Sequence, residues 1–169
     1  MTGKVLLPLL LASAAHAEKA WVFEPGQSLV SVELGPAKAR LSATSLAVKG
    51  RIHELDGGAV EAEIRLAASS FTTGSAERDR KLDRDGEIVF EGRAPPPGKD
   101  GTLHLKGTLS VHGVSRAVDI PVQVVRAGGR AFGHASFILA LRQFGLPLDD
   151  ARIDVDAGLR PEDGALASR

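Results

Sequence analysis

Apolar and polar residues alternate along most of this chain, and a period of two predicts β-strands with one buried face. From Val60 to Leu66 the apolar residues take the even positions, and charged residues take the odd ones. The same alternation runs from Thr102 to His112 and from Ile153 to Leu159. These stretches predict strands whose apolar side chains point into a common core.

The stretch 115–126 is a further predicted strand, with an interruption. Its apolar residues take the even positions from Val118 to Val124, and Pro121 falls on the opposite face. Proline has no backbone N–H to donate to a neighbouring strand. We therefore expect Pro121 to lie at a sheet edge or at a bulge.

Further strands are predicted between clusters of glycine, proline and aspartate, residues that favour turns. They cover residues 20–23, 28–34, 45–54, 87–92 and 130–141. Two hairpins are expected. In the first, strand 102–112 turns through Gly113-Val114 into 115–126, and in the second this strand turns through Gly128-Gly129 into 130–141.

Two stretches do not alternate and predict short helices. Residues 37–45 are rich in alanine, lysine and arginine and follow Gly35-Pro36. Residues 75–82 begin with Ser75, a suitable N-cap, and continue in a charged run typical of one or two exposed helical turns. The end of the chain has no pattern from Arg160 onward, and we expect residues 161–169 to form a disordered tail.

About eight strands joined by short turns, with no alternation of strands and helices, predict an antiparallel barrel or sandwich. The strand lengths favour the barrel, because tilted strands must be long and closure removes exposed edges. The predicted fold is all-β: an eight-stranded antiparallel lipocalin-like β-barrel over residues 18–160, with one or two short helical turns. Such a barrel is either filled by side chains or holds one small ligand.

The predicted inner face consists mainly of valine, leucine and isoleucine, with a few phenylalanines. Scarce aromatic residues, 4% of the chain, are compatible with an apolar cavity, although a close-packed core is the commoner outcome in a small domain. The residues expected to line the interior, and to bind any ligand there, are Val60, Ile64, Leu66, Phe90, Leu103, Leu105, Leu109, Val111, Val118, Ile120, Val122, Phe137, Phe144, Ile153 and Val155.

Composition narrows the function classes. A chain of 169 residues forms one domain, and 21 basic against 21 acidic residues exclude a nucleic-acid binder held by net positive charge. Cysteine is absent, which excludes disulfides, thiolate zinc sites and cysteine nucleophiles.

The first residues predict export. Lys4 precedes an apolar run over 5–15 that ends in Ala15-His16-Ala17, the three parts of a secretory signal peptide. We expect residues 1–17 to be removed by cleavage after Ala17. The run is shorter than the roughly 20 residues of a membrane anchor, so no stable membrane insertion is expected.

Candidate catalytic and metal-binding groups are poorly arranged. His104 and His112 share a strand face but are separated by too many residues to hold one metal, and His112 beside Gly113 is interpreted as a turn residue. The densest acidic cluster is Asp149, Asp150, Asp154 and Asp156. Asp154 and Asp156 alternate with apolar residues, which predicts a solvated strand face rather than two facing carboxylates. We predict no catalytic residue, no metal and no cofactor.

Three segments, in order, resemble the YceI-like family of polyisoprenoid-binding, lipocalin-like proteins. Residues 109–118, LSVHGVSRAV, resemble its strand–turn–strand motif L-x-x-H-G-V-[ST]-[RK]-x-V. Residues 68–74 with 78–82, and the Arg-Gln-Phe-Gly stretch from Arg142, are similar to its middle and late motifs, and Gly50-Arg51-Ile52 resembles its G-x-F strand. The early F-x-V-x-H motif is missing around 32–36, and the aromatic FFD motif is missing after Leu82.

The resemblance implies a periplasmic barrel with a long apolar tunnel that holds an isoprenoid chain, such as a polyprenyl lipid or quinone tail, and it implies no catalysis. The leading hypothesis is therefore a periplasmic binding or carrier protein for such an apolar small molecule, with no nucleic-acid partner. A ligand-free structural or stress-response barrel that acts through its surface is the alternative. A hydrolase that uses the cluster Asp149–Asp156 is a remote third.

Overall fold

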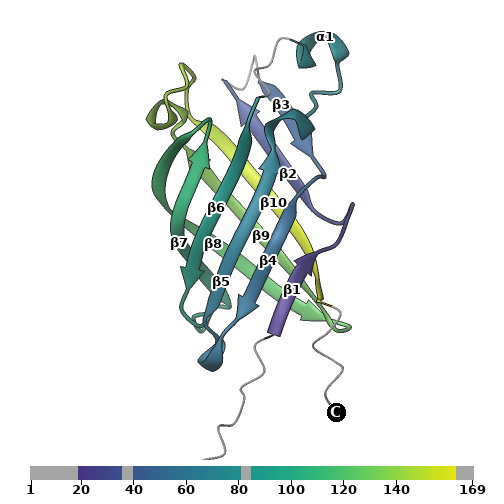
Figure 1. Cartoon of the computed structure of the whole chain (residues 1–169), viewed down its shortest axis with the longest axis vertical. Coiled ribbons are helices and arrows are strands. Elements are labelled where there is room, and N and C mark those ends of the chain that lie inside the picture. The colour runs from purple at the N-terminus through teal and green to yellow at the C-terminus, as the bar shows by residue number, and fades with distance from the viewer. Residues whose placement is uncertain (1–18, 36–39, 81–84, 163–169) are drawn as a thin grey trace, which may run out of the picture.

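The structure is a computed structural model that describes residues 19–35, 40–80 and 85–162 (Figure 1). The predicted signal peptide lies outside the described residues. Among those that are described, ten strand segments form one antiparallel sheet. They are β1 (Lys19–Phe23), β2 (Leu29–Leu34), β3 (Leu41–Ser45), β4 (Lys49–Glu54), β5 (Val60–Ala67), β6 (Glu87–Ala94), β7 (Thr102–Val111), β8 (Val114–Ala127), β9 (Arg130–Leu139) and β10 (Ala151–Pro161). The short helices are η1 (Asp56–Gly58), η2 (Ala68–Ser70), α1 (Ala76–Asp79) and η3 (Leu141–Phe144).

The sheet closes into a barrel of eight strands. β1 pairs with β4, the order continues through β5, β6, β7, β8 and β9 to β10, and β10 returns to pair with β1. β2 lies beyond β1 on the same edge of β10, and β3 lies beside β2 as β4 lies beside β1. β1 and β2 therefore form one interrupted barrel strand, and β3 and β4 form another. With β5 to β10 this makes eight strands, so the predicted eight-stranded antiparallel barrel is confirmed.

The helix predicted over 37–45 is wrong where the chain is described. Leu41–Ser45 form β3, in which Leu41, Ala43 and Ser45 pair with alternate residues of β2. A helix this short is marginal in water, whereas the ladder with β2 satisfies the same backbone groups and buries the alternating side chains. Residues 36–39 lie outside the description.

The single strand predicted over 45–54 is interrupted. Ser45 is the last residue of β3, and its buried hydroxyl accepts a hydrogen bond from the Ala47 N–H at 3.1 Å. This local bond turns the chain, and β4 begins at Lys49. The interruption lets one stretch of chain pair first with β2 and then with β1.

Three further boundaries differ from the prediction. Pro161, the first residue of the predicted tail, belongs to β10 and pairs with Trp21 of β1, and residues 163–169 of that tail lie outside the description. The first hairpin turns at His112-Gly113, one residue earlier than predicted, with φ of 51° and 76°. The strand predicted over 130–141 ends at Leu139, and the chain continues into η3.

The helix predicted from Ser75 is present as one turn. α1 spans Ala76–Asp79, and the Ser75 hydroxyl accepts a hydrogen bond from the Arg78 N–H at 3.4 Å. Asp79 in turn accepts bonds from Thr72 and Thr73, which fixes this turn to the segment before it. α1 lies at the upper end of the barrel in Figure 1.

Glycines allow the backbones of β6 and β7 to approach closely. A Cβ atom at Gly107 would lie 2.1 Å from the Glu91 carbonyl oxygen and 2.5 Å from the Gly92 Cα. In β9, by contrast, a Cβ at Gly133 would lie 3.5 Å from its nearest atom, a methyl carbon of Val122. The barrel wall therefore depends on the missing side chain at Gly107, whereas a methyl group at Gly133 would make ordinary contacts.

Gly107→Ala should lower the free energy of unfolding by about 2–3 kcal/mol, because the new methyl group collides with backbone that cannot move aside. Gly133→Ala is the matched control, with an expected change of less than about 1 kcal/mol. Urea unfolding followed by circular dichroism measures both values. Equal effects of the two substitutions would contradict this account of the wall.

Candidate functional site

The inner face of the barrel is one continuous apolar surface. Of the fifteen residues that the sequence predicts to face inward, nine belong to a single buried hydrophobic cluster and the other six are partly buried and packed against it. Within it Phe144 is 1% exposed, the lowest value for any large side chain in the described ranges. The alternation of strand residues therefore predicts the inner face correctly, and the role of these residues in ligand binding stays a prediction.

Other members of this cluster were missed by the sequence analysis. Val30, Val32 and Leu34 of β2 alternate with polar residues, a signal that could have identified them. Val48 follows a strand end, and Leu141 lies in η3, where no periodic pattern marks an inward side chain. Their burial follows from tertiary packing.

Some inward residues keep accessible surface although the wall around them is intact. Ile64 is half-buried at the centre of β5, between the buried Ala62 and Leu66, and it is paired on both sides, with Gly50 and Phe90. Val155 of β10 is likewise half-buried and paired on both sides. A close-packed core removes nearly all accessible surface. Such partial exposure fits a lumen that the protein's own side chains do not fill completely.

An ion pair crosses one end of the barrel. Arg126 of β8 donates two hydrogen bonds to the Glu54 carboxylate of β4, at 3.1 and 3.2 Å. β4 and β8 are separated by three strands in either direction around the ring, so this pair joins opposite walls. We call Arg126, Glu54 and the adjoining Trp21 the crossbar.

Trp21 completes the crossbar beneath the ion pair. It is 4% exposed, and its indole N–H donates to Glu54 Oε2 at 3.3 Å. The Arg126 guanidinium lies 5.3 Å from the centre of its ring, and the Lys19 ammonium lies 4.4 Å from it. This end of the lumen is therefore closed by an aromatic ring and a two-point ion pair.

The electrostatics of Glu54 reflect its place in the crossbar. Partial burial acts to raise the pKa of the Glu54 carboxyl, but the hydrogen bonds from Arg126 and Trp21 and the positive charges of Arg126 and Lys19 outweigh it. The pKa of Glu54 therefore lies below its ordinary value. The carboxylate is held in its charged form, which keeps the ion pair across the barrel.

The opposite end carries the longer connections. η2 and α1 lie between β5 and β6, and η3 lies between β9 and β10, at the upper end in Figure 1. A hollow of about 610 Å³ lies at this rim, lined by Gly35, Arg142, Asp149 and Asp150. Arg142 and Asp149 form an exposed ion pair at 3.0 Å, so Asp149 lies in a solvated loop as predicted.

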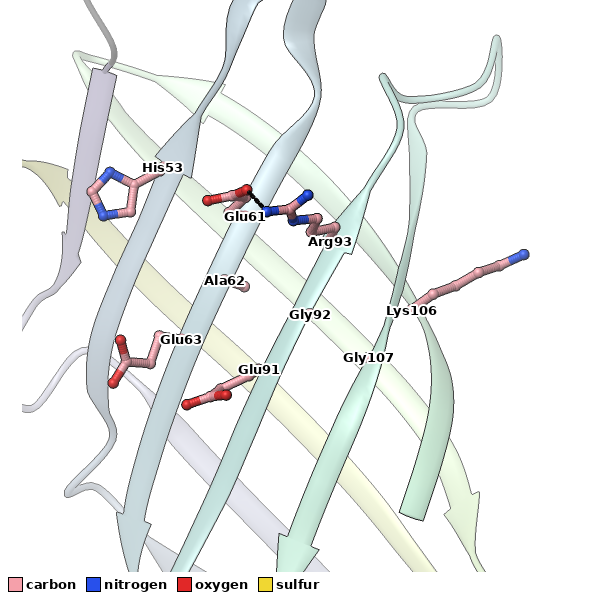
Figure 2. A pocket seen from close by; sticks show the side chains of 9 residues that line it. All are labelled: His53, Glu61, Ala62, Glu63, Glu91, Gly92, Arg93, Lys106 and Gly107. Carbon is pink, nitrogen blue, oxygen red and sulfur yellow. Dashed lines mark ion pairs between the residues drawn. The ribbon is translucent and has the colours of Figure 1, made fainter. Parts of the chain in front are cut away.

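A second hollow, of about 590 Å³, lies on the outer wall over β4 to β7 (Figure 2). Gly92 and Gly107 form its floor, and Glu61 and Arg93 pair across it, while the Lys106 side chain extends away from the others. Its charged residues largely compensate one another. This hollow does not suit an apolar ligand.

The remaining candidate groups lie on the outer face. His134 and Asp156 pair at 2.8 Å, and Arg152 donates to Asp154 at 3.1 Å. A hydrogen bond from Ser136, and to a smaller extent one from Arg152, lowers the pKa of Asp154. The prediction that Asp154 and Asp156 form an outward strand face is confirmed. Within residues 19–35, 40–80 and 85–162, no group of three histidine or acidic residues could hold a metal.

No helix in the described part of the chain has the length and apolar character needed to cross a membrane.

Comparison with known proteins agrees with this architecture. A family model described as the YceI-like domain matches residues 21–160. No curated protein matches the sequence. Among solved structures, BcnA of Burkholderia cenocepacia is similar, with a TM-score of 0.71 and 13% identity over 80% of this chain and 98% of its own.

Two further solved structures share the fold. A polyisoprenoid binding domain from Saccharophagus degradans, implicated in plant cell wall breakdown, has a TM-score of 0.69 and 14% identity, covering 84% of this chain and 98% of its own. The YCEI protein of Campylobacter jejuni has a TM-score of 0.62 and 13% identity, covering 76% and 89%.

The crossbar should make stability depend on acid. Because the pKa of Glu54 is lowered in the folded state, its contribution is complete above the unfolded-state pKa and is lost as pH falls through the folded-state value. The stability difference between the wild type and Glu54→Gln should therefore be largest near pH 7 and shrink as the pH falls from about 5 to about 3. Thermal unfolding across this pH range measures it. A difference that stays constant with pH would contradict the ion pair.

Proposed function

The chain belongs to the YceI-like domain family, and we propose that it is a non-enzymatic binding protein that holds an apolar, isoprenoid-like chain inside its barrel. One observation carries the proposal: the inner face is a single apolar surface that keeps accessible area at Ile64 and Val155, where the wall is intact. Each ligand methylene buried there contributes about 0.8 kcal/mol to binding.

The shape of the lumen supports a long ligand. β8 has 14 residues, and at about 3.3 Å per residue and a tilt of about 40° it spans roughly 35 Å along the barrel axis. The crossbar closes one end of this length. Such a lumen suits an extended hydrocarbon chain better than a compact molecule.

The solved structures share the barrel fold with this chain, and this shared fold is the support that they give to an isoprenoid-like ligand. The domain from Saccharophagus degradans is named as polyisoprenoid-binding, and at 14% identity its likeness concerns the barrel. Away from the crossbar, the predicted inward residues of β5 to β10 are aliphatic or phenylalanine, and their side chains offer an isoprenoid chain no polar partner. Recognition then rests on burial of hydrocarbon.

Binding inside the lumen predicts that a bulkier inward residue displaces the ligand. Val155→Phe on β10 adds volume beside the small residue Ala135 and should weaken binding of a fluorescent polyprenyl chain at least tenfold. Val125→Phe on β8 is the matched control, because Val125 is 63% exposed on the outer face and should bind like the wild type. Fluorescence titration measures both.

The wild-type protein should also release an apolar lipid into organic solvent. An extract without lipid, together with no binding of the labelled chain, would contradict the proposed function and favour a ligand-free barrel.

Export to the periplasm is the second part of the proposal, and it rests on the predicted signal peptide. Protein recovered from the periplasm should begin at Glu18, as measured by N-terminal sequencing. Protein that retains Met1 would contradict it.

A further inference from the structure

The pairing of β8 with β9 covers only the part of the two strands next to their turn. Gly128 and Gly129, with φ of 59° and 75°, form the two-residue turn. The ladder runs from the pair Ala127 and Arg130 to the pair Gln123 and His134, and there it ends. β8 continues to Val114 and β9 to Leu139 without pairing with each other. We call the region between residues 114–122 of β8 and 135–139 of β9 the slot.

Pro121 explains where the ladder stops. A two-residue turn with positive φ at both positions is flanked by a hydrogen-bonded pair, and such pairs recur at every second residue. The bonded pairs are therefore 127 with 130, 125 with 132 and 123 with 134, so the next would join Pro121 to Ser136. Proline has no N–H to donate to the Ser136 carbonyl. Pro121 was expected at a sheet edge or at a bulge; it lies instead in an interior strand, paired with His104 of β7 on one side and beyond the end of the β9 ladder on the other.

The other side of β8 is intact. The backbone N–H and C=O groups of its even-numbered residues point toward β7, and the ladder with β7 is continuous from Val114 to Gln123. β9 is likewise paired with β10 from Ala131 to Leu139. The slot is therefore a local break between two otherwise fully paired strands, and it runs from the rim that carries η3 down the wall.

The short helix η3 lies against β8 at the rim end of the slot. After β9 the chain folds back as η3 against β8. Leu141 and Phe144 of η3 are 6% and 1% exposed, and Gly145 lies beside Val114, where a Cβ would be 4.0 Å from a Val114 methyl carbon. Val118 and Phe137 on the inner edges of the slot remain half-buried. η3 is thus a plug whose contacts with β8 are side-chain packing.

The energetics distinguish the slot from the paired parts of the wall. Separating two strands where they are paired breaks ladder hydrogen bonds, each with a net value of about 1 kcal/mol and a larger cost when left unpaired. Opening the slot breaks none between β8 and β9, because none are present over 114–122. Gly145, with φ of 75°, follows the plug and can act as its hinge.

We propose that the slot is the lateral route by which an isoprenoid-like chain enters and leaves the lumen, with η3 as the displaceable plug. This inference rests on the proposed function. The crossbar closes one end of the barrel, and a slot that extends from the other rim lets a long chain pass sideways instead of being threaded end on. Ile138, 63% exposed on the outer face of β9 along the slot, offers the arriving chain an apolar contact.

Amide hydrogen exchange tests the slot itself. The N–H groups of Ser115, Ala117 and Asp119 point toward the slot and should exchange at least tenfold faster than those of Val118, Ile120 and Val122, which donate to β7. Equal protection of the two sets would overturn the slot.

A covalent bridge tests its role, and the absence of cysteine in the chain makes the labelling specific. Asp119→Cys with Ile138→Cys places one thiol on each side of the slot, to be joined by a flexible bis-maleimide. The control is Val125→Cys with Phe132→Cys, two exposed residues that already pair directly. Both double variants are measured before and after bridging, by stopped-flow exchange and by equilibrium titration of a fluorescent polyprenyl chain.

The bridge across the slot should slow association and dissociation at least tenfold and leave Kd nearly unchanged, while the control bridge changes neither rate. Unchanged rates with the slot bridged would overturn the lateral route but leave the proposed function standing. Absence of binding in every unbridged variant would instead overturn the proposed function. Pro121→Thr restores the missing N–H donor and should therefore slow association and dissociation of the polyprenyl chain without a chemical bridge.

Discussion

The pairing of β10 with β1 turns an open sheet into a closed wall, and the rest of the structure depends on it. β1 contributes three residue pairs, from Phe23 with Leu159 to Trp21 with Pro161, and β2 continues the same seam along β10 with six more. They remove the two free edges of the ring and place the apolar face of every strand on the inside. With no cysteine to form a disulfide, the wall is held by its ladders and by side-chain packing.

Closure gives the two ends and the side of the barrel different properties. Arg126 and Glu54 can meet across the lumen only because the ring brings β8 opposite β4, and Trp21 is buried beneath them. At the other end, the connections are long and the rim is charged. Between β8 and β9 the ladder stops at Gln123 and His134, and η3, with the buried Leu141 and Phe144, lies against β8. An apolar lumen with one closed end and one weakly held side is suited to taking up a long hydrocarbon chain.

Local sequence pattern predicted the wall and failed where distant contacts decide. Alternation identified β5, β7, β8 and β10 and their inward aliphatic residues, because a strand's period of two is set by its own backbone. The missing N–H of Pro121 correctly indicated an interrupted ladder, but it lies in an interior strand rather than at a sheet edge. The residues of β3 were mistaken for a helix because their pairing with β2 outweighs local propensity. The crossbar joins Trp21, Glu54 and Arg126, far apart in sequence, and no local signal marks such a contact.

The central claim is that the lumen holds an apolar chain, and nuclear magnetic resonance of methyl groups tests it directly. A polyprenyl chain that carries a nitroxide spin label at its terminus broadens the signals of methyl groups close to it. The account predicts stronger broadening at Ile64 and Val155 on the inner face than at the exposed methyl groups of Val125. Broadening at Val125 with unchanged Ile64 and Val155 would place the chain on the outer wall and contradict the account.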